Sequence, residues 1–231
     1  MKLSKCISII LVPLSMLAAH GVFAQDNELG WTMERAVKQL DRQGEDFETV
    51  LADADIEWKK KDGTVDRTVK GRIYMNEDGD VRLSAAQPTE HTMLVSGSTL
   101  YQHDPAKAVV EEYRLSQHKD RLEPYVALGF STTGKDLSDD FLVTFVGEQQ
   151  IGGRRALGLE LTPIKDSTRQ AVARIELWVD QASWLPVRQI ITQSAGGDSM
   201  TVTYTGTARN LALNPDLFKD DWPKGTEKIR K

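Results

Sequence analysis

The sequence predicts a mainly β protein of the α+β class, a single domain with a long, meandering antiparallel sheet of about eleven strands. Short runs in which apolar and polar residues alternate recur along most of the chain, and residues that favour turns separate them. Apolar residues at helical spacing appear in only two substantial segments. No charge block, low-complexity stretch or linker divides the chain, which favours one domain over two.

The elements of the first half follow from these patterns. Apolar residues at helical spacing predict an amphipathic helix over about 28–42. These residues are Leu29, Met33, Val37 and Leu40. Asp62 and Gly63 predict a tight hairpin turn between the first two strands. The strands expected after the helix lie at 50–58, 65–75, 81–85, 91–96, 99–103 and 108–113.

In the second half, residues 119–130 interrupt the strands and predict a short apolar helix that ends near Gly129. A helical turn is expected at 166–171. The remaining strands are expected at 141–148, at 154–163, in a hairpin within 171–192, and at 199–208. The basic ending KDDWPKGTEKIRK is typical of a solvated tail, although Trp222 and Pro223 within it indicate an ordered contact with the body of the protein.

The hairpin AVARIELWVDQASWLPVRQIIT carries large apolar side chains on both faces. Trp178 points away from Leu177, and Ile190 points away from Val187, which is expected to share a face with Ile191. A strongly curved sheet would explain this pattern if its concave side enclosed an apolar cavity. A plain β-core, with the outer side chains packed under a loop or a partner, also explains it, and the pattern alone favours the plain core.

The N-terminus is typical of a secretory signal peptide. Lys2 and Lys5 precede a short apolar run that Pro13 interrupts, and small residues lead up to Gln25. We therefore expect 1–24 to be cleaved and 25–231 to form the mature, exported domain. Cys6, the only cysteine, lies inside the signal and away from the position that lipid attachment requires.

Charge and motif searches exclude several functions. Loss of the two leader lysines lowers the basic count from 29 to 27 against 34 acidic residues, so the formal net charge falls from −5 to −7. Such a charge disfavours nucleic acid as a partner. His91, His103 and His118 are too widely separated for a metal site, and no nucleophile motif or phosphate-binding loop occurs. The sequence predicts no catalytic residue, metal or cofactor, and hence a protein that is not an enzyme.

Five stretches, taken in order, resemble the LolA family of periplasmic lipoprotein carriers. They are GRIYMNEDGDVRLSAAQPTEHTMLVSGSTLYQHDP, LEPYVALGF, LELTP, IELWVDQASWLPVRQ and ARNLALNPDLFKDDWPKGTEKI. Each is unspecific alone, but their order and spacing together are fairly specific and cover essentially the whole mature chain. The resemblance reverses the preference for a plain core, because it implies an unclosed antiparallel β-barrel of about eleven strands with an α-helical lid over an apolar cavity.

The resemblance also implies a function. A soluble, monomeric periplasmic carrier would bind the acyl chains of lipoproteins or related lipids, taking them from an inner-membrane exporter to an outer-membrane acceptor. A lipid-sensing regulatory domain with the same fold is the alternative, although the absence of a second module disfavours it. The third class, a hydrolase on a β-scaffold, lacks a nucleophile and base.

Alternation and the expected lid together predict which residues contact the cargo. Val81 and Leu83 stand out because their neighbours Arg82 and Ser84 are polar. The full cavity wall is expected at Trp58, Met75, Val81, Leu83, Met93, Leu159 and Leu177, and the lid faces at Leu40, Tyr125 and Leu128.

One position departs from the family pattern. The best-studied carriers have a basic residue followed by proline after the third strand, and an ungapped comparison places Glu77 and Asp78 there. An ionised carboxylate has no donors, so Glu77 cannot hydrogen-bond to lid carbonyls as the basic residue is thought to do. Pairing of Glu77 with Arg72 or Arg82 would contribute at most about 1 kcal/mol. We expect a lid held mainly by apolar packing.

Overall fold

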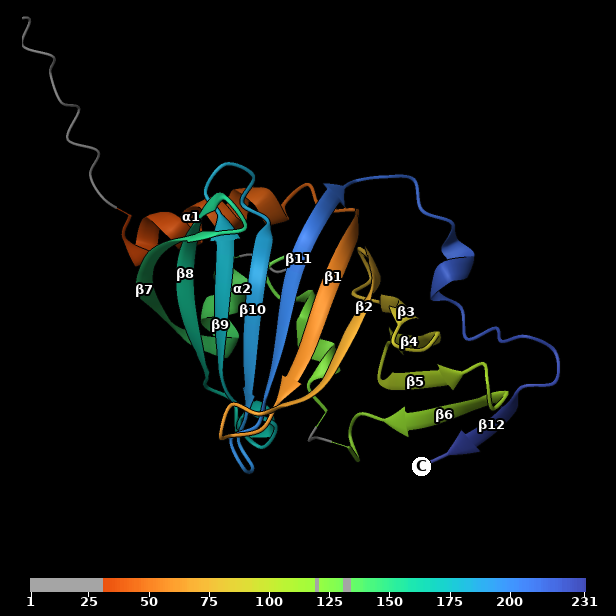
Figure 1. The fold of residues 1–231 in the computed structure, drawn as a ribbon. Coiled ribbons are helices and arrows are strands. Elements are labelled where there is room, and N and C mark those ends of the chain that lie inside the picture. Colours follow the sequence, from red (N-terminus) through yellow and green to blue (C-terminus); the bar gives the residue numbers. More distant parts are fainter. Residues whose placement is uncertain (1–30, 119–120, 131–133) are drawn as a thin grey trace, which may run out of the picture. The chain divides into compact units, whose positions relative to one another are not determined.

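A single sheet runs through the computed structural model, which describes residues 31–118, 121–130 and 134–231 (Figure 1). The expected signal at 1–24 lies outside the described residues. In the described part, the strands are β1 (Thr49–Lys59), β2 (Val65–Asn76), β3 (Val81–Gln87), β4 (His91–Ser96), β5 (Thr99–Asp104), β6 (Val109–Arg114), β7 (Phe141–Ile151), β8 (Arg154–Pro163), β9 (Val172–Asp180), β10 (Pro186–Gln193), β11 (Ser199–Arg209) and β12 (Glu227–Arg230).

The strand order is β12-β6-β5-β4-β3-β2-β1-β11-β10-β9-β8-β7, so β12 and β7 are the two edges and the sheet is not closed. Neighbours are antiparallel throughout, except that β12 runs parallel to β6. The predicted unclosed antiparallel barrel is confirmed. Its extra strand over the expected eleven is β12, which comes from the segment that the sequence assigned to a solvated tail.

Helical elements are few in the described residues: α1 (Met33–Gly44), α2 (Gly134–Asp140), α3 (Asp166–Arg169), and the 3-10 turns η1 (Glu123–Ala127) and η2 (Pro215–Phe218). Of the apolar helix expected at 119–130, the described residues 121–130 form only the turn η1, because Gly129, at φ +84°, soon redirects the chain. Sequence patterns missed α2, whose one apolar side chain, Leu137, gives no periodicity although it is fully buried.

The two apolar faces of the hairpin at 171–192 are both accounted for. Leu177 and Ile191 join the main core, whereas Trp178 packs on the opposite face with a small cluster that includes Val187. Gly158 lies opposite Trp178, and a Cβ there would come within 2.6 Å of the indole. The expectation that Val187 shares a face with Ile191 is wrong, because an irregularity between Pro186 and Arg188 interrupts the alternation.

Residues 210–231, which we call the C-terminal strap, lead from β11 to β6 at the edge of the sheet (Figure 1). The Arg82 side chain donates to the carbonyl of Leu217 at 3.0 Å, and the Trp222 ring lies 5.0 Å from that of His103. β12 then pairs with β6. The predicted ordered contact at Trp222 is confirmed, and the expected solvated tail is wrong, because strand pairing orders it.

Candidate functional site

The concave face of the sheet is filled by its own side chains over strands β8 and β9. Leu159, Leu161, Ile175 and Leu177 are all fully buried there. Residues 122–130, which we call the lid segment, contain η1 and pack against this surface through Val126 and Phe130. The approach at Gly129 is so close that a Cβ would lie 2.9 Å from the Leu177 side chain. This half of the interior is therefore a packed core.

Two buried polar side chains tie the lid segment to the sheet. Gln189 on β10 donates from its side-chain amide to the carbonyl of Leu128. The Tyr204 hydroxyl on β11 lies 3.1 Å from the carbonyl of Val126 and 2.9 Å from the side-chain oxygen of Gln189. Its single proton can serve one of these acceptors at a time. Burial raises the pKa of Tyr204 well above its usual value, so the donor is retained.

These contacts, which we call the lid latch, consist of Gln189, Tyr204 and the carbonyls of Val126 and Leu128. They qualify the expectation that apolar packing mainly holds the lid, because buried hydrogen bonds add to it. The sequence signal was weak: Gln189 is a polar residue between apolar ones on a strand, and Tyr204 resembles any core aromatic residue.

Glu77 takes no part in this latch. It is exposed in the turn between β2 and β3. Neither arginine considered as its partner is directed to it: Arg72 contacts Asp53 at 3.0 Å, and Arg82 donates to the C-terminal strap.

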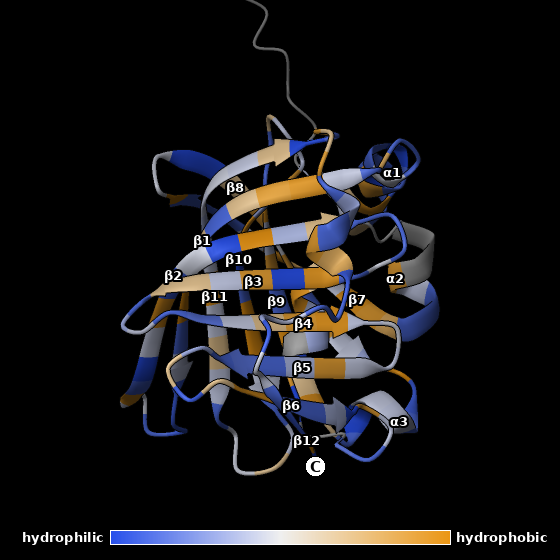
Figure 2. Cartoon of the chain, turned by 90° about the vertical axis from the view of Figure 1, so that its right-hand side faces the viewer, coloured by the Kyte–Doolittle hydropathy of each residue, from blue (hydrophilic) through white to orange (hydrophobic). Residues whose placement is uncertain are grey.

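A pocket of about 380 Å³ occupies the other half of the concave face, over β3–β6. Its apolar wall comes from Trp58, Leu83, Met93 and Val109. Polar and charged residues complete the lining at Arg67, Thr89, Glu90, His91, Gln102, His103, Asp104, Lys107 and Glu111. In Figure 2, apolar and polar segments alternate along β3, as expected for a strand that turns one face to the interior.

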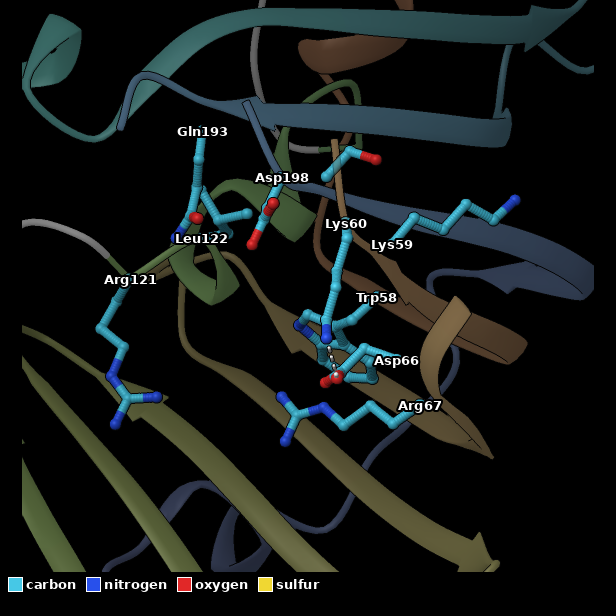
Figure 3. Close-up of a pocket in the computed structure, with 10 residues that line it drawn as sticks. Trp58, Lys59, Lys60, Asp66, Arg67, Arg121, Leu122, Gln193 and Asp198 are labelled. Carbon is cyan, nitrogen blue, oxygen red and sulfur yellow. Dashed lines mark ion pairs between the residues drawn. The ribbon is translucent and has the colours of Figure 1, made fainter. Parts of the chain in front are cut away.

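A second pocket of about 250 Å³ adjoins the first, and Trp58 and Arg67 line both. Figure 3 shows Arg67 and Arg121 on opposite sides of this second pocket, with the Arg67 side chain extended toward the side of Arg121. The Arg67 guanidinium lies 3.8 Å from the centre of the Trp58 ring, within the range of a cation–π contact. Trp58 and Arg67 therefore form the boundary between the pocket with the apolar wall and a basic pocket.

The structure places all ten predicted cargo residues in or against the main core. Trp58, Tyr125 and Leu128 are partly buried, and the other seven are buried. Three of the ten, Trp58, Leu83 and Met93, line the pocket of about 380 Å³. The other seven, Leu40, Met75, Val81, Tyr125, Leu128, Leu159 and Leu177, remain predicted cargo contacts.

Residue selection from the sequence missed Arg67, Gln102 and Val109 in the pocket wall. The position of Arg67 could have been found, because Val65, Arg67 and Val69 occupy every second position along β2, and such residues share a face in a regular strand. Among the described residues, no cluster of histidine, cysteine and carboxylate side chains could hold a metal ion. No helix in the same part of the chain is long and apolar enough to span a membrane.

An open antiparallel sheet with a helical segment and a pocket with one apolar wall on its concave face defines a half-barrel with the features of a binding protein. Residues 47–221 match the family described as "Outer membrane lipoprotein carrier protein LolA". This match spans about three quarters of the chain, so the protein belongs to the LolA family. The resemblance inferred from the sequence is confirmed.

One solved structure shares this fold at low sequence identity, and others align more loosely. An uncharacterized conserved protein from Thermus thermophilus aligns with a TM-score of 0.54 and 11% identity, covering 87% of this chain and 100% of that one. A LolA superfamily protein from Nitrosomonas europaea aligns with a TM-score of 0.43 and 15% identity over 83% and 99% of the two chains. A search of curated proteins finds no match.

Proposed function

We propose that this protein is an exported, monomeric periplasmic carrier of acyl chains, borne by lipoproteins or by related lipids. It takes its cargo from an inner-membrane exporter and delivers it to an outer-membrane acceptor. The observation that carries the proposal is the apolar wall of Trp58, Leu83, Met93 and Val109 on the concave face of a LolA-family chain. A carrier of this kind transfers cargo without making or breaking a covalent bond.

The size of the pocket supports a stepwise mode of loading. A volume of about 380 Å³ lies near the lower end of ligand pockets, which suits one acyl chain better than three. Burial of each methylene contributes about 0.8 kcal/mol. A second chain has to displace the lid segment and thereby separate the lid latch, whose hydrogen bonds contribute about 1 kcal/mol each. A few buried methylenes therefore offset the opening of the lid.

This competition also explains how cargo can leave. An empty interior closes again over its own apolar residues, so the net affinity is lower than the burial of acyl chains alone would give. Leu128 and Tyr125 are the lid residues that return to the core. Release to an acceptor then requires no separate energy source on this protein.

The first test asks whether the purified protein carries lipid. Protein secreted by a membrane-containing host should begin at Gln25 and should release acyl lipids that mass spectrometry detects after denaturation. A product that keeps its leader in the membrane, or one that is free of lipid and does not bind an apolar fluorescent probe, would contradict the proposal.

A matched pair of variants locates the binding face. Leu83 lines the pocket, and its neighbour Ser84 lies on the opposite face of β3. Leu83→Glu should abolish probe binding, because burying a charge is strongly unfavourable. Ser84→Glu adds the same charge outside the pocket and should leave binding unchanged. Equal binding by both folded variants would exclude this face as the cargo site.

A further inference from the structure

The pocket of about 250 Å³ is basic although the protein is acidic. Four basic residues, Lys59, Lys60, Arg67 and Arg121, line it together with two carboxylates, Asp66 and Asp198. The whole chain carries a formal net charge of −5. Because the chain as a whole is negatively charged, this local excess of positive charge does not reflect a surface that is basic throughout. It therefore favours an anionic ligand.

Only one of the two carboxylates pairs with a basic residue of this pocket. Asp198 accepts a hydrogen bond from the backbone N–H of Lys61 at 3.0 Å, and Asp66 is 4.0 Å from Lys60, at the limit of an ion pair. Lys59 contacts Glu57 at 2.8 Å. Among the described residues, no carboxylate lies within ion-pairing distance of Arg67, whose cation–π contact is with Trp58.

Arg67 is well placed to bind an anion at the boundary of the two pockets. A guanidinium that stacks on an aromatic ring keeps its N–H donors in a plane parallel to that ring. There the donors remain free to bind a phosphate or carboxylate in a bidentate manner. Arg121 approaches from the opposite side (Figure 3). Trp58 also lines the pocket with the apolar wall, so one ligand can reach both environments.

We propose that the basic pocket binds the anionic headgroup, a phosphate or carboxylate, of an amphiphile whose acyl chain occupies the pocket lined by Leu83 and Met93. This inference rests on the proposed function and extends it from acyl chains in general to anionic lipids. Arg67 is the residue that selects the headgroup, and Trp58 separates the headgroup from the chain.

Two lysolipids with the same acyl chain test the inference. Lysophosphatidylglycerol has an anionic headgroup and lysophosphatidylcholine a zwitterionic one, and each is titrated into the delipidated mature protein below its micelle concentration. The wild-type protein should bind the anionic lipid about fivefold more tightly at low salt, as expected for an exposed charge contact. This preference should shrink as the salt concentration rises.

Arg67→Gln should remove the headgroup preference and leave the affinity for lysophosphatidylcholine within about twofold of the wild type. Arg72→Gln is the matched control, because Arg72 lies on the same strand, faces away from both of these pockets and contacts Asp53. It removes the same charge and should keep the preference.

The outcomes separate the two proposals. Equal affinities of the wild type for both lysolipids, or a preference that survives in Arg67→Gln, would overturn the headgroup inference and leave the carrier proposal standing. Binding of neither lysolipid would overturn both. Glycerol 3-phosphate, which lacks the acyl chain, should not compete at equal concentration. Effective competition would assign the basic pocket to a soluble phosphate and overturn the proposal that its ligand is an amphiphile.

Discussion

The two halves of this one sheet use their concave faces differently. Over β8 and β9 the inward side chains are fully buried, and the lid segment is hydrogen-bonded to Gln189 and Tyr204 on the adjoining strands. Over β3–β6 the inward side chains leave a pocket of about 380 Å³. The C-terminal strap supports this second half from the outside.

This difference separates stability from binding. A packed interior lowers the free energy of the folded protein but has no room for cargo, whereas an open pocket forgoes part of that packing. The strap compensates by covering the outer face of the strands that carry the pocket. Losses of side-chain volume should therefore affect stability mainly in the packed half and binding mainly in the open half.

The largest expected effect on stability is that of Leu159→Ala in the packed half. Leu159 is fully buried, so truncation should lower the free energy of unfolding by about 3 kcal/mol. Met93→Ala, next to an existing pocket, should lower it less, by about 2 kcal/mol, while weakening probe binding. Urea unfolding and a probe titration measure the two quantities. An equal loss of stability in both variants would contradict the division into halves.

Removal of the strap's aromatic anchor should have the next largest effect. The half-buried Trp222 packs against His103 and Tyr101, so Trp222→Ala should destabilise the protein by about 2 kcal/mol. Hydrogen exchange should accelerate in β5 and β6 before it does in β8. Uniform acceleration across the sheet would mean that the strap does not support one half selectively.

A smaller effect is expected from Tyr204→Phe, which removes one donor of the lid latch without changing the core's shape. The carbonyl of Val126 and the Gln189 amide oxygen lose this donor, and stability should fall by about 1–2 kcal/mol. Exchange of the lid-segment amides should rise, whereas the affinity for a single-chain probe should stay unchanged, because such a probe binds without displacing the lid segment. Unchanged exchange in the lid segment would show that the latch does not hold it.

The smallest effect belongs to Glu77→Gln. Glu77 is exposed in a turn at the opposite end of β2 from Arg67, so its charge should matter little to either half. Stability should change by less than about 0.5 kcal/mol. Probe affinity should stay within about twofold of the wild type. A larger loss of affinity would place a polar contact with cargo or lid at this turn.

Local patterns predicted the sheet well because each strand alternates clearly. The runs through Ile56 and Leu83 located their strands and inward faces directly. Elements that depend on distant partners were not visible in the same way. β12 exists because β6 offers an edge, and α2 is helical although its one buried side chain leaves no pattern.

The site was predicted only in part, for a related reason. Alternation identifies which side chains point inward, and all ten predicted residues do lie in or against the core. It does not show how far the interior is filled, which depends on how the lid segment packs over Leu177. The contact of Arg67 with Trp58 joins two strands, and alternation along either strand alone does not reveal it.

The central claim is that a single acyl chain enters the open half and leaves the packed half intact. Methyl NMR of the wild-type protein, titrated with a single-chain apolar probe, tests it without any substitution. The methyl signals of Met93 and Leu83 should shift in proportion to occupancy, and those of Leu159 and Leu161 should stay in place. Shifts at Leu159 and Leu161 with none at Met93 would contradict the claim and place the cargo beneath the lid segment.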